Sequence, residues 1–115
     1  MRGECSLQYI IEADGGVYPC DFYVTDEWRL GNINETTFSE LKTKPIAEQF
    51  ISTSRTIADE CKSCPYVRLC RGGCRRNQEP FEEGEAQLNY FCSAYQEFFA
   101  AQREKLKELA RLLAR

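Results

Sequence analysis

The sequence contains no histidine, and no hydrophobic run approaches the about 20 residues that a membrane-spanning helix needs. Without histidine, a mixed cysteine–histidine zinc site is excluded. The N-terminus has no basic region leading into an apolar stretch, so no secretory signal is visible. Excess positive charge is also missing, because 15 lysine and arginine residues face 18 aspartate and glutamate residues and give a net charge of −3. We therefore expect a cytoplasmic protein with neither a membrane nor a nucleic acid as a partner.

The composition is typical of one small folded domain. Hydrophobic residues make up 43% of the 115 residues and charged residues 29%, which argues against a disordered chain. A chain of this length builds only a modest core and often needs additional stabilisation, such as disulfides or a metal site. Met1 is the only methionine and a strand is predicted soon after it, so we expect the chain to be a piece of a longer protein.

Seven cysteines are the candidates to provide that stabilisation. Four of them lie in ECKSCPYVRLCRGGC, residues 60–74, and the others are Cys5, Cys20 and Cys92. A disulfide framework does not suit them, because seven is an odd number and no export signal is present. Cysteines two or three residues apart also bridge poorly, since a disulfide requires particular separations between Cα and Cβ atoms.

Zinc and iron–sulfur clusters are the two remaining interpretations. A four-cysteine zinc site usually pairs two Cys-x-x-Cys units about 15–20 residues apart, whereas five residues separate Cys64 from Cys70. One zinc would leave three thiols without a role, although thiolates bind zinc readily in a fragment produced in air. A [4Fe–4S] cubane accepts several cysteines from one tight loop and a further one from afar. Gly72 and Gly73 can adopt positive φ and bring backbone N–H groups close to sulfur. The spacing favours a cluster and leaves zinc open.

The predicted fold class is α+β: a small cysteine-rich metal-cluster domain with a short β-hairpin, cluster-binding loops and a long C-terminal helix. β-branched and aromatic residues predict strands over residues 6–12 and 17–23, with a turn at Ala13-Asp14-Gly15-Gly16. This hairpin would bring Cys5 and Cys20 to the same open end. Residues 28–33 predict a further short strand or extended segment.

Two helices are predicted before the cysteine-rich segment. Thr37 and Glu40 form a Thr-x-x-Glu capping box that opens the first helix. Pro45 ends that helix, because the residue before proline avoids the α region, and begins the second one. The second helix should contribute three core residues, Ile46, Phe50 and Ile51. Residues 61–74 are predicted to be a cysteine loop, and residues 77–87 an irregular polar segment.

The C-terminal residues predict one long helix, capped by Ser93 with Gln96 at its third position. Large apolar residues recur through it at near-helical spacing: Leu88, Phe91, Tyr95, Phe98, Phe99, Leu106, Leu109 and Leu113. Packing within the domain is the simplest interpretation of this stripe. The alternative is docking onto a domain outside this chain.

The cysteines together give Cys5-x9-Gly15-x4-Cys20, then Cys61-x2-Cys64-x5-Cys70-x3-Cys74, then Cys92. This pattern resembles the seven-cysteine signature of the SPASM domain, the C-terminal auxiliary-cluster region of a group of radical S-adenosylmethionine enzymes. Within that group, ADGGVYPCDFYV at residues 13–24 and LGNI at residues 30–33 resemble the anaerobic sulfatase-maturating enzymes. The resemblance implies a SPASM domain at residues 1–92, and a helix at residues 93–115 that packs on it or on the catalytic barrel.

The resemblance implies two [4Fe–4S] clusters held by thiolates alone. The ligands of the first would be a cysteine upstream of Met1 together with Cys5, Cys20 and Cys74, so one ligand is missing here. The ligands of the second would be Cys61, Cys64, Cys70 and Cys92. With only three thiolates, the first site of such a fragment is expected to hold an incomplete cluster, zinc or nothing.

The implied function is electron transfer and substrate-side deprotonation in an enzyme that oxidises a sulfatase cysteine or serine to formylglycine. In that family a deoxyadenosyl radical removes a β-hydrogen, a base takes the thiol or hydroxyl proton, and one electron leaves the substrate radical. Asp21 matches the proposed base. From the residues alone, a structural role beside Cys20 is the simpler interpretation of Asp21. In a strand, Asp21 would point away from Cys20 and toward the substrate.

The Cys-x3-Cys-x2-Cys motif of the radical-generating cluster is absent. We therefore expect a domain of an enzyme that is inactive by itself. Its implied partners are the radical S-adenosylmethionine barrel of the same full-length chain, which binds S-adenosylmethionine, and a sulfatase polypeptide. Two alternatives stay open: the same domain in an enzyme that modifies a ribosomal peptide, and a zinc-stabilised module that binds a protein segment without redox chemistry.

Overall fold

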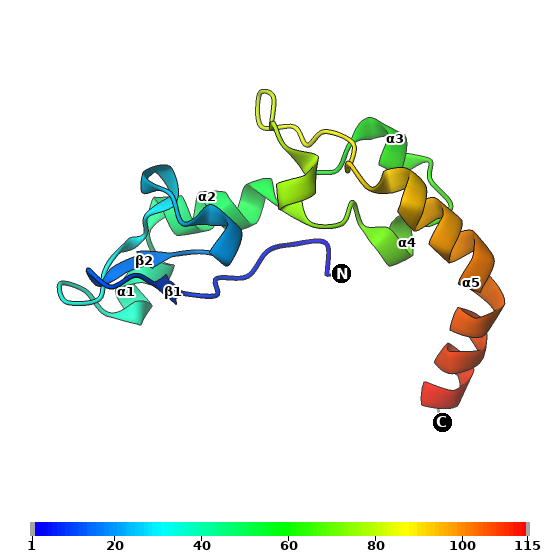
Figure 1. Ribbon diagram of the computed structural model, residues 1–115, viewed down its shortest axis with the longest axis horizontal. Coiled ribbons are helices and arrows are strands. Elements are labelled where there is room, and N and C mark those ends of the chain that lie inside the picture. The colour runs from blue at the N-terminus through cyan, green and yellow to red at the C-terminus, as the bar shows by residue number, and fades with distance from the viewer. Residues whose placement is uncertain (1, 115) are drawn as a thin grey trace.

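The computed structural model describes residues 2–114, which form an elongated body. Its extents are 51 × 38 × 22 Å and its radius of gyration is 17.1 Å, whereas about 13 Å is typical of a closed domain of this length. In Figure 1, α1 (Phe38–Lys42) and most of α2 (Pro45–Thr53) lie with the sheet at one end. The other end holds α3 (Asp59–Lys62), α4 (Val67–Cys70) and α5 (Cys92–Leu113).

Three short antiparallel strands form a sheet in the order β1-β2-β3. Their bounds are Ile10–Ile11 for β1, Gly16–Tyr18 for β2 and Gly31–Asn32 for β3. The pairing of β1 with β2 confirms the predicted hairpin, and the sheet and helices together confirm the α+β class. The strands are shorter than predicted, because Tyr9 takes a positive φ of 55° just before β1 and the chain turns into a 3₁₀ helix soon after β2.

The hairpin turn depends on Gly15, whose φ is +84°. A Cβ atom there would lie 2.5 Å from Nδ2 of Asn34, so a larger residue would meet both backbone strain and a collision. Asp14 supports the turn by accepting a hydrogen bond of 2.8 Å from the backbone N–H of Gly16. The predicted turn residues therefore have the roles that the sequence assigned to them.

Two apolar clusters join the sheet to α2. One contains Val17, Leu30, Leu41 and Ala47, and the other contains Tyr23, Trp28 and Phe50. The aromatic rings of the second cluster meet edge to face, with centroids 5.2–6.0 Å apart. Two 3₁₀ helices supply its first two members: η1 (Asp21–Tyr23) and η2 (Asp26–Trp28). Phe50 is fully buried, and the half-buried Ile46 and Ile51 pack around this core, which confirms the predicted core residues of α2.

The predicted helix boundaries are confirmed for α1 and α2. Thr37 accepts a bond of 3.3 Å from the backbone N–H of Glu40, and the Glu40 carboxylate accepts one of 2.7 Å from the Thr37 N–H. α1 ends at Lys42, and Pro45 is the first residue of α2. The cysteine loop differs from the prediction, because it contains the short helices α3 and α4.

The prediction for the C-terminal helix needs two corrections. α5 begins at Cys92 without a side-chain cap, so the predicted capping role of Ser93 is wrong. Phe99 is buried beside Tyr66, with ring centroids 5.9 Å apart. Farther along, packing within the domain does not cover the apolar stripe, because Leu109 is 53% exposed and Leu113 is 86% exposed.

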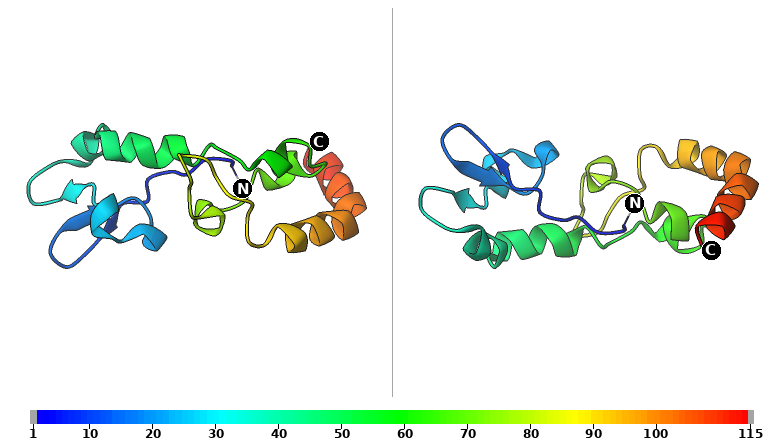
Figure 2. Two further views of the ribbon diagram at one scale, coloured as in Figure 1. Left: turned by 90° about the horizontal axis from the view of Figure 1, so that it is seen from above. Right: turned by 90° about the horizontal axis from the view of Figure 1, so that it is seen from below.

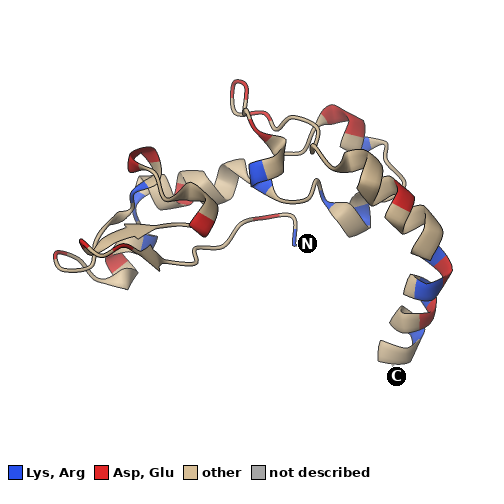
Figure 3. Cartoon of the chain, in the orientation of Figure 1, with Lys and Arg blue, Asp and Glu red and all other residues tan. Residues whose placement is uncertain are grey.

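α5 lies at the opposite end of the molecule from the sheet in the views of Figure 2. Its C-terminal half contains both basic and acidic residues (Figure 3), and Leu109, Leu112 and Leu113 in the same half are exposed. Within residues 2–114, none of the helices combines the length and the hydropathy needed to cross a bilayer.

Candidate metal centre

The first group of cysteines consists of Cys5, Cys20 and Cys74, which line one cavity of about 460 Å³. They come from three parts of the chain: the N-terminal segment, the residue after β2 and its proline, and the residue before η3 (Arg75–Gln78). All seven cysteines of the chain are free thiols. The structure therefore brings together the three residues that the resemblance implied for the first cluster.

Hydrogen bonds fix Cys5 against the end of α2. The backbone N–H of Cys5 donates to the Ser54 hydroxyl at 2.8 Å, and that hydroxyl donates to the carbonyl of Ile51. Burial raises the pKa of the Cys5 thiol, while the Ser54 bond and the charge of Arg75 lower it and the charge of Cys74 raises it again. Burial also raises the pKa of Cys20, the N–H of Phe22 lowers it, and the charges of Asp21 and Cys5 raise it further.

The second group consists of Cys61, Cys64, Cys70 and Cys92. Burial raises the pKa of Cys61, and the charges of the other three cysteines raise it further. Burial also raises the pKa of Cys70, where the Gly72 N–H acts in the opposite direction and the charges of Cys92 and Cys64 add to the rise. Cys61 and Cys70 are thus both influenced by cysteines that the resemblance places in the same group.

A left-handed turn separates the two groups. Arg71, Gly72 and Gly73 have φ values of 52°, 82° and 77°. A Cβ on Gly72 would lie 2.4 Å from Nε2 of Gln78, and one on Gly73 would lie 2.5 Å from Nδ2 of Asn89. The expected positive φ of the two glycines is confirmed.

Two buried amides hold this turn and were missed in the sequence. The side chains of Gln78 and Asn89 both donate to the carbonyl of Gly72. The carbonyl of Asn89 accepts a bond of 2.9 Å from the N–H of Cys92, so Asn89 ties the turn to the start of α5. Both residues lie in or next to a polar irregular segment, where no periodicity marks a buried side chain.

Asp21 differs from its predicted geometry. It opens η1 rather than continuing a strand, and the Cys20 thiol donates a hydrogen bond to Oδ1 of Asp21 at 3.2 Å. The prediction that these two side chains point in opposite directions is therefore wrong, because alternation holds only in an extended strand. Asp21 is exposed and lines the same cavity as the first cysteine group.

The donor set fits an iron–sulfur cluster better than one metal ion. Within residues 2–114, no three Cys, His, Asp or Glu side chains lie close enough to share a single ion. Zinc–sulfur bonds of about 2.3 Å would require tetrahedral thiolates ~3.8 Å apart. A cubane has its irons at separate corners and holds its thiolates farther apart. Three thiols around one cavity, with a backbone N–H group beside Cys20, fit such a cluster.

Similarity to characterised proteins supports the same assignment. The cysteine-type anaerobic sulfatase-maturating enzyme of Clostridium perfringens strain 13 is 48% identical over 86% of this chain and 27% of its own length. The cysteine-type enzyme of Clostridium novyi is 46% identical over 99% of this chain and 30% of its own length. The serine-type enzyme of Bacteroides thetaiotaomicron is 32% identical over 86% of this chain and 24% of its own length.

Solved structures show the same fold. Native anSMEcpe with bound AdoMet aligns with a TM-score of 0.89 and 46% identity, over 96% of this chain and 30% of that chain. Native anSMEcpe with bound AdoMet and Cp18Cys peptide aligns with a TM-score of 0.90 and 45% identity, over 98% of this chain and 31% of that chain. The chain thus spans less than a third of the length of these relatives.

A family model described as an iron–sulfur cluster-binding domain, SPASM, matches residues 5–65, which is more than half of the chain. The match includes Cys5, Cys20, Cys61 and Cys64, and the remaining cysteines follow at the spacing described above. The predicted resemblance is confirmed. The chain therefore belongs to the SPASM family of iron–sulfur cluster-binding domains, and it resembles the member found in anaerobic sulfatase-maturating enzymes.

Proposed function

We propose that the chain is the auxiliary-cluster domain of a radical S-adenosylmethionine enzyme that oxidises a sulfatase cysteine or serine to formylglycine. One observation carries the proposal: a chain with seven free thiols, three of which line one cavity, is 48% identical over 99 residues to a sulfatase-maturating enzyme. Zinc remains the alternative occupant of either group in protein purified in air.

The second group would hold a complete [4Fe–4S] cluster through Cys61, Cys64, Cys70 and Cys92. The first group would hold another through Cys5, Cys20 and Cys74 with a fourth ligand from elsewhere in the full-length protein. When bound, these clusters supply a one-electron acceptor or relay near the substrate. The seven free thiols also suit a reducing cytoplasmic compartment.

Asp21 would act as the base that takes the substrate's thiol or hydroxyl proton. Its carboxylate accepts a hydrogen bond from the Cys20 thiol. A Cys20 thiolate bound to iron has no such proton, so the carboxylate becomes available to another donor in the cavity. Cluster binding and proton acceptance by Asp21 are thereby linked.

The uncovered face of α5 would dock onto the radical S-adenosylmethionine barrel of the same full-length chain. Phe98, Leu109 and Leu112 are all more than half exposed, and the similar enzymes are more than three times as long as this chain. That barrel would bind S-adenosylmethionine, and a sulfatase polypeptide would lie between it and Asp21. Residues 1–92 would then be the cluster-binding unit and residues 93–115 its connection to the barrel.

The test uses the full-length protein that contains this chain, reconstituted anaerobically with iron and sulfide. It is incubated with S-adenosylmethionine and sulfatase peptides that carry cysteine or serine, and formylglycine is detected by mass spectrometry. Wild-type enzyme should convert at least one peptide, while Cys74→Ala should not and Lys42→Ala, at the exposed end of α1, should match wild type. Deoxyadenosine release without formylglycine from either peptide would contradict the proposal and point to another peptide substrate.

A further inference from the structure

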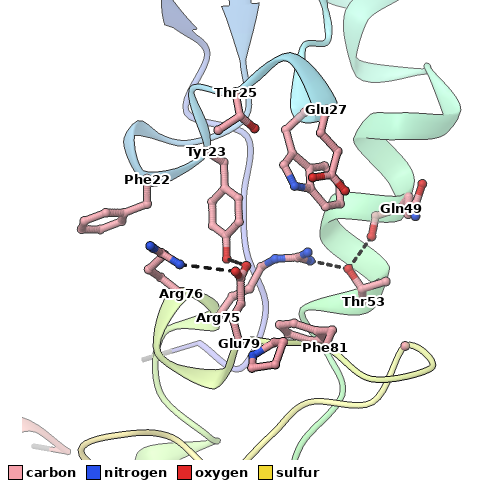
Figure 4. Close-up of a pocket in the computed structure, with 13 residues that line it drawn as sticks. Phe22, Tyr23, Thr25, Glu27, Gln49, Thr53, Arg75, Arg76, Glu79 and Phe81 are labelled. Carbon is pink, nitrogen blue, oxygen red and sulfur yellow. Dashed lines mark hydrogen bonds and ion pairs between the residues drawn. The ribbon is translucent and has the colours of Figure 1, made fainter.

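Arg75 follows Cys74 directly and is one of the buried charged residues of the structure, with only 6% of its surface exposed. Its guanidinium lies 4.7–5.2 Å from the centroids of four aromatic rings: Tyr23, Trp28, Phe50 and Phe81. Figure 4 shows the side chain crossing the cavity below Tyr23 toward α2. Such contacts are favourable when the cation is desolvated.

Hydrogen bonds fix the guanidinium but do not neutralise it. Nη1 donates to the carbonyl of Phe50 at 3.2 Å and to the hydroxyl of Thr53. The Nε–H of Arg75 has no hydrogen-bond partner among residues 2–114. Nor does any carboxylate of these residues form an ion pair with it within 4.0 Å. A buried charge in this state is costly unless an opposite charge lies nearby.

Besides the Glu79 carboxylate in the cavity of Figure 4, the candidates for that opposite charge are the thiolates of the first cysteine group. Arg75 lines the cavity of about 460 Å³ together with Cys5, Cys20 and Cys74. It also lines the neighbouring cavity of about 480 Å³ drawn in Figure 4. The residue therefore forms part of the wall between the aromatic cage and the proposed first cluster.

We propose that Arg75 is the fixed counter-charge of the first cluster site and makes its reduction potential less negative. This inference rests on the proposed function, in which that site takes one electron from the substrate radical. Reduction adds one negative charge to the site, and a buried cation nearby favours the reduced state through a weakly screened attraction. Arg75 itself neither gains nor loses a proton, because an arginine stays charged throughout.

The side chain suits this role better than lysine would. The guanidinium fork reaches Phe50 and Thr53 at once, and its planar face stacks on the surrounding rings. A lysine at this position would keep the charge but would lose part of that positioning. We therefore expect the reduction potential of the first cluster in Arg75→Lys to lie between those of wild type and a neutral variant.

Arg76 provides the matched control. It is the next residue and has the same charge, but its side chain is 52% exposed and pairs with Glu79 at 3.3 Å. Water and Glu79 both screen it, so its removal should have a much smaller effect on the cluster. Neutral variants of Arg75 and Arg76 change the net charge equally. A difference between their cluster potentials therefore comes from the buried position of Arg75.

The experiment is a redox titration of the full-length reconstituted enzyme with dithionite, followed by EPR. The signal of the first cluster is identified as the one lost in Cys74→Ala. Arg75→Gln should shift its midpoint to a more negative potential, Arg75→Lys should shift it less, and Arg76→Gln should leave it close to wild type. An unchanged midpoint in Arg75→Gln, or equal shifts in Arg75→Gln and Arg76→Gln, would overturn the inference.

A second variant keeps the test decisive if Arg75→Gln does not fold. Glu79 lines the Figure 4 cavity with Arg75, and the charges of both act on Tyr23. Glu79→Gln removes a nearby negative charge and should move the midpoint in the opposite direction, to a less negative potential. An unchanged midpoint potential in Glu79→Gln would overturn the inference. The proposed function fails instead if the wild-type enzyme holds no cluster at this site.

Discussion

The thiol of Cys20 donates a hydrogen bond to the carboxylate of Asp21, with 3.2 Å between Sγ and Oδ1. A residue proposed to anchor a cluster and a residue proposed to move a proton are thus in direct contact. The charge of Asp21 helps to raise the pKa of Cys20. Removing that charge should make the Cys20 thiolate slightly easier to form and should not weaken metal binding.

Asp21→Asn should therefore abolish catalysis while sparing the clusters. Formylglycine formation by the full-length enzyme should fall about 10²–10⁴-fold, the usual effect of losing a positioned base. Iron content should equal that of wild type, and deoxyadenosine release should persist because hydrogen abstraction comes first. Asp26→Asn is the control, since Asp26 also opens a 3₁₀ helix but does not line the cavity. Loss of iron from Asp21→Asn would make Asp21 a structural residue.

Gly72→Ala should weaken the second cysteine group. Gly72 has a φ of +82°, and an added Cβ would lie 2.4 Å from the buried Gln78 amide. Gly84 has nearly the same φ, +83°, but a Cβ there would meet nothing within 4 Å. Gly84→Ala should cost only the about 1–2 kcal/mol of a left-handed alanine. Gly72→Ala should lower the free energy of unfolding by more than this, as measured with denaturant, and should bind less iron per chain. If the two variants lose the same stability and the same iron, this account is wrong.

Local signals in the sequence predicted local structure well. The capping box at Thr37, the proline that begins α2 and the glycine turn after Cys70 all act through a few neighbouring residues, so their consequences follow from sequence spacing. The grouping of the cysteines also followed, but from a family resemblance and not from the residues themselves. The structure places the thiols of Cys5, Cys20 and Cys74 around one cavity, in agreement with the first group.

Long-range packing was beyond such signals. The cage around Arg75 joins η1, η2, α2 and the loop after η3, and no spacing in the chain marks those contacts. The prediction for the orientation of Asp21 is wrong because the last three residues of the predicted strand, Asp21–Tyr23, form a 3₁₀ helix. The apolar stripe of α5 was assigned to the core because periodicity shows that a face is apolar without showing what covers it.

Acid should weaken the α1 cap. The Thr37 N–H and the hydroxyls of Thr36 and Thr37 lower the pKa of Glu40 below its ordinary value of 4.5. A carboxyl whose pKa is lowered by folding stabilises the fold above the ordinary value, and this contribution is lost as the pH falls through the folded-state pKa. The thermal stability advantage of wild type over Glu40→Gln should therefore shrink between about pH 6 and about pH 3. A difference that stays constant over this range would show that the cap does not titrate.

The uncovered face of α5 makes a separate prediction. Phe99 is 8% exposed, so Phe99→Ala should cost about 3–5 kcal/mol in any form of the protein. Leu109 is 53% exposed, so Leu109→Ala should change the stability of this 115-residue chain by only about 0.5 kcal/mol. In the full-length enzyme the same substitution should cost about 2–5 kcal/mol if the proposed docking onto the barrel buries the side chain there. Equal small effects in both forms would argue against docking of this face.

The division of the cysteines is tested most directly by Mössbauer spectroscopy of this chain after anaerobic reconstitution with labelled iron. The second group is complete within the chain, so wild type should show a [4Fe–4S] cubane there. Cys92→Ala should abolish that signal, and Cys74→Ala should retain it because Cys74 belongs to the first group. A cubane that survives Cys92→Ala and disappears in Cys74→Ala would contradict the account.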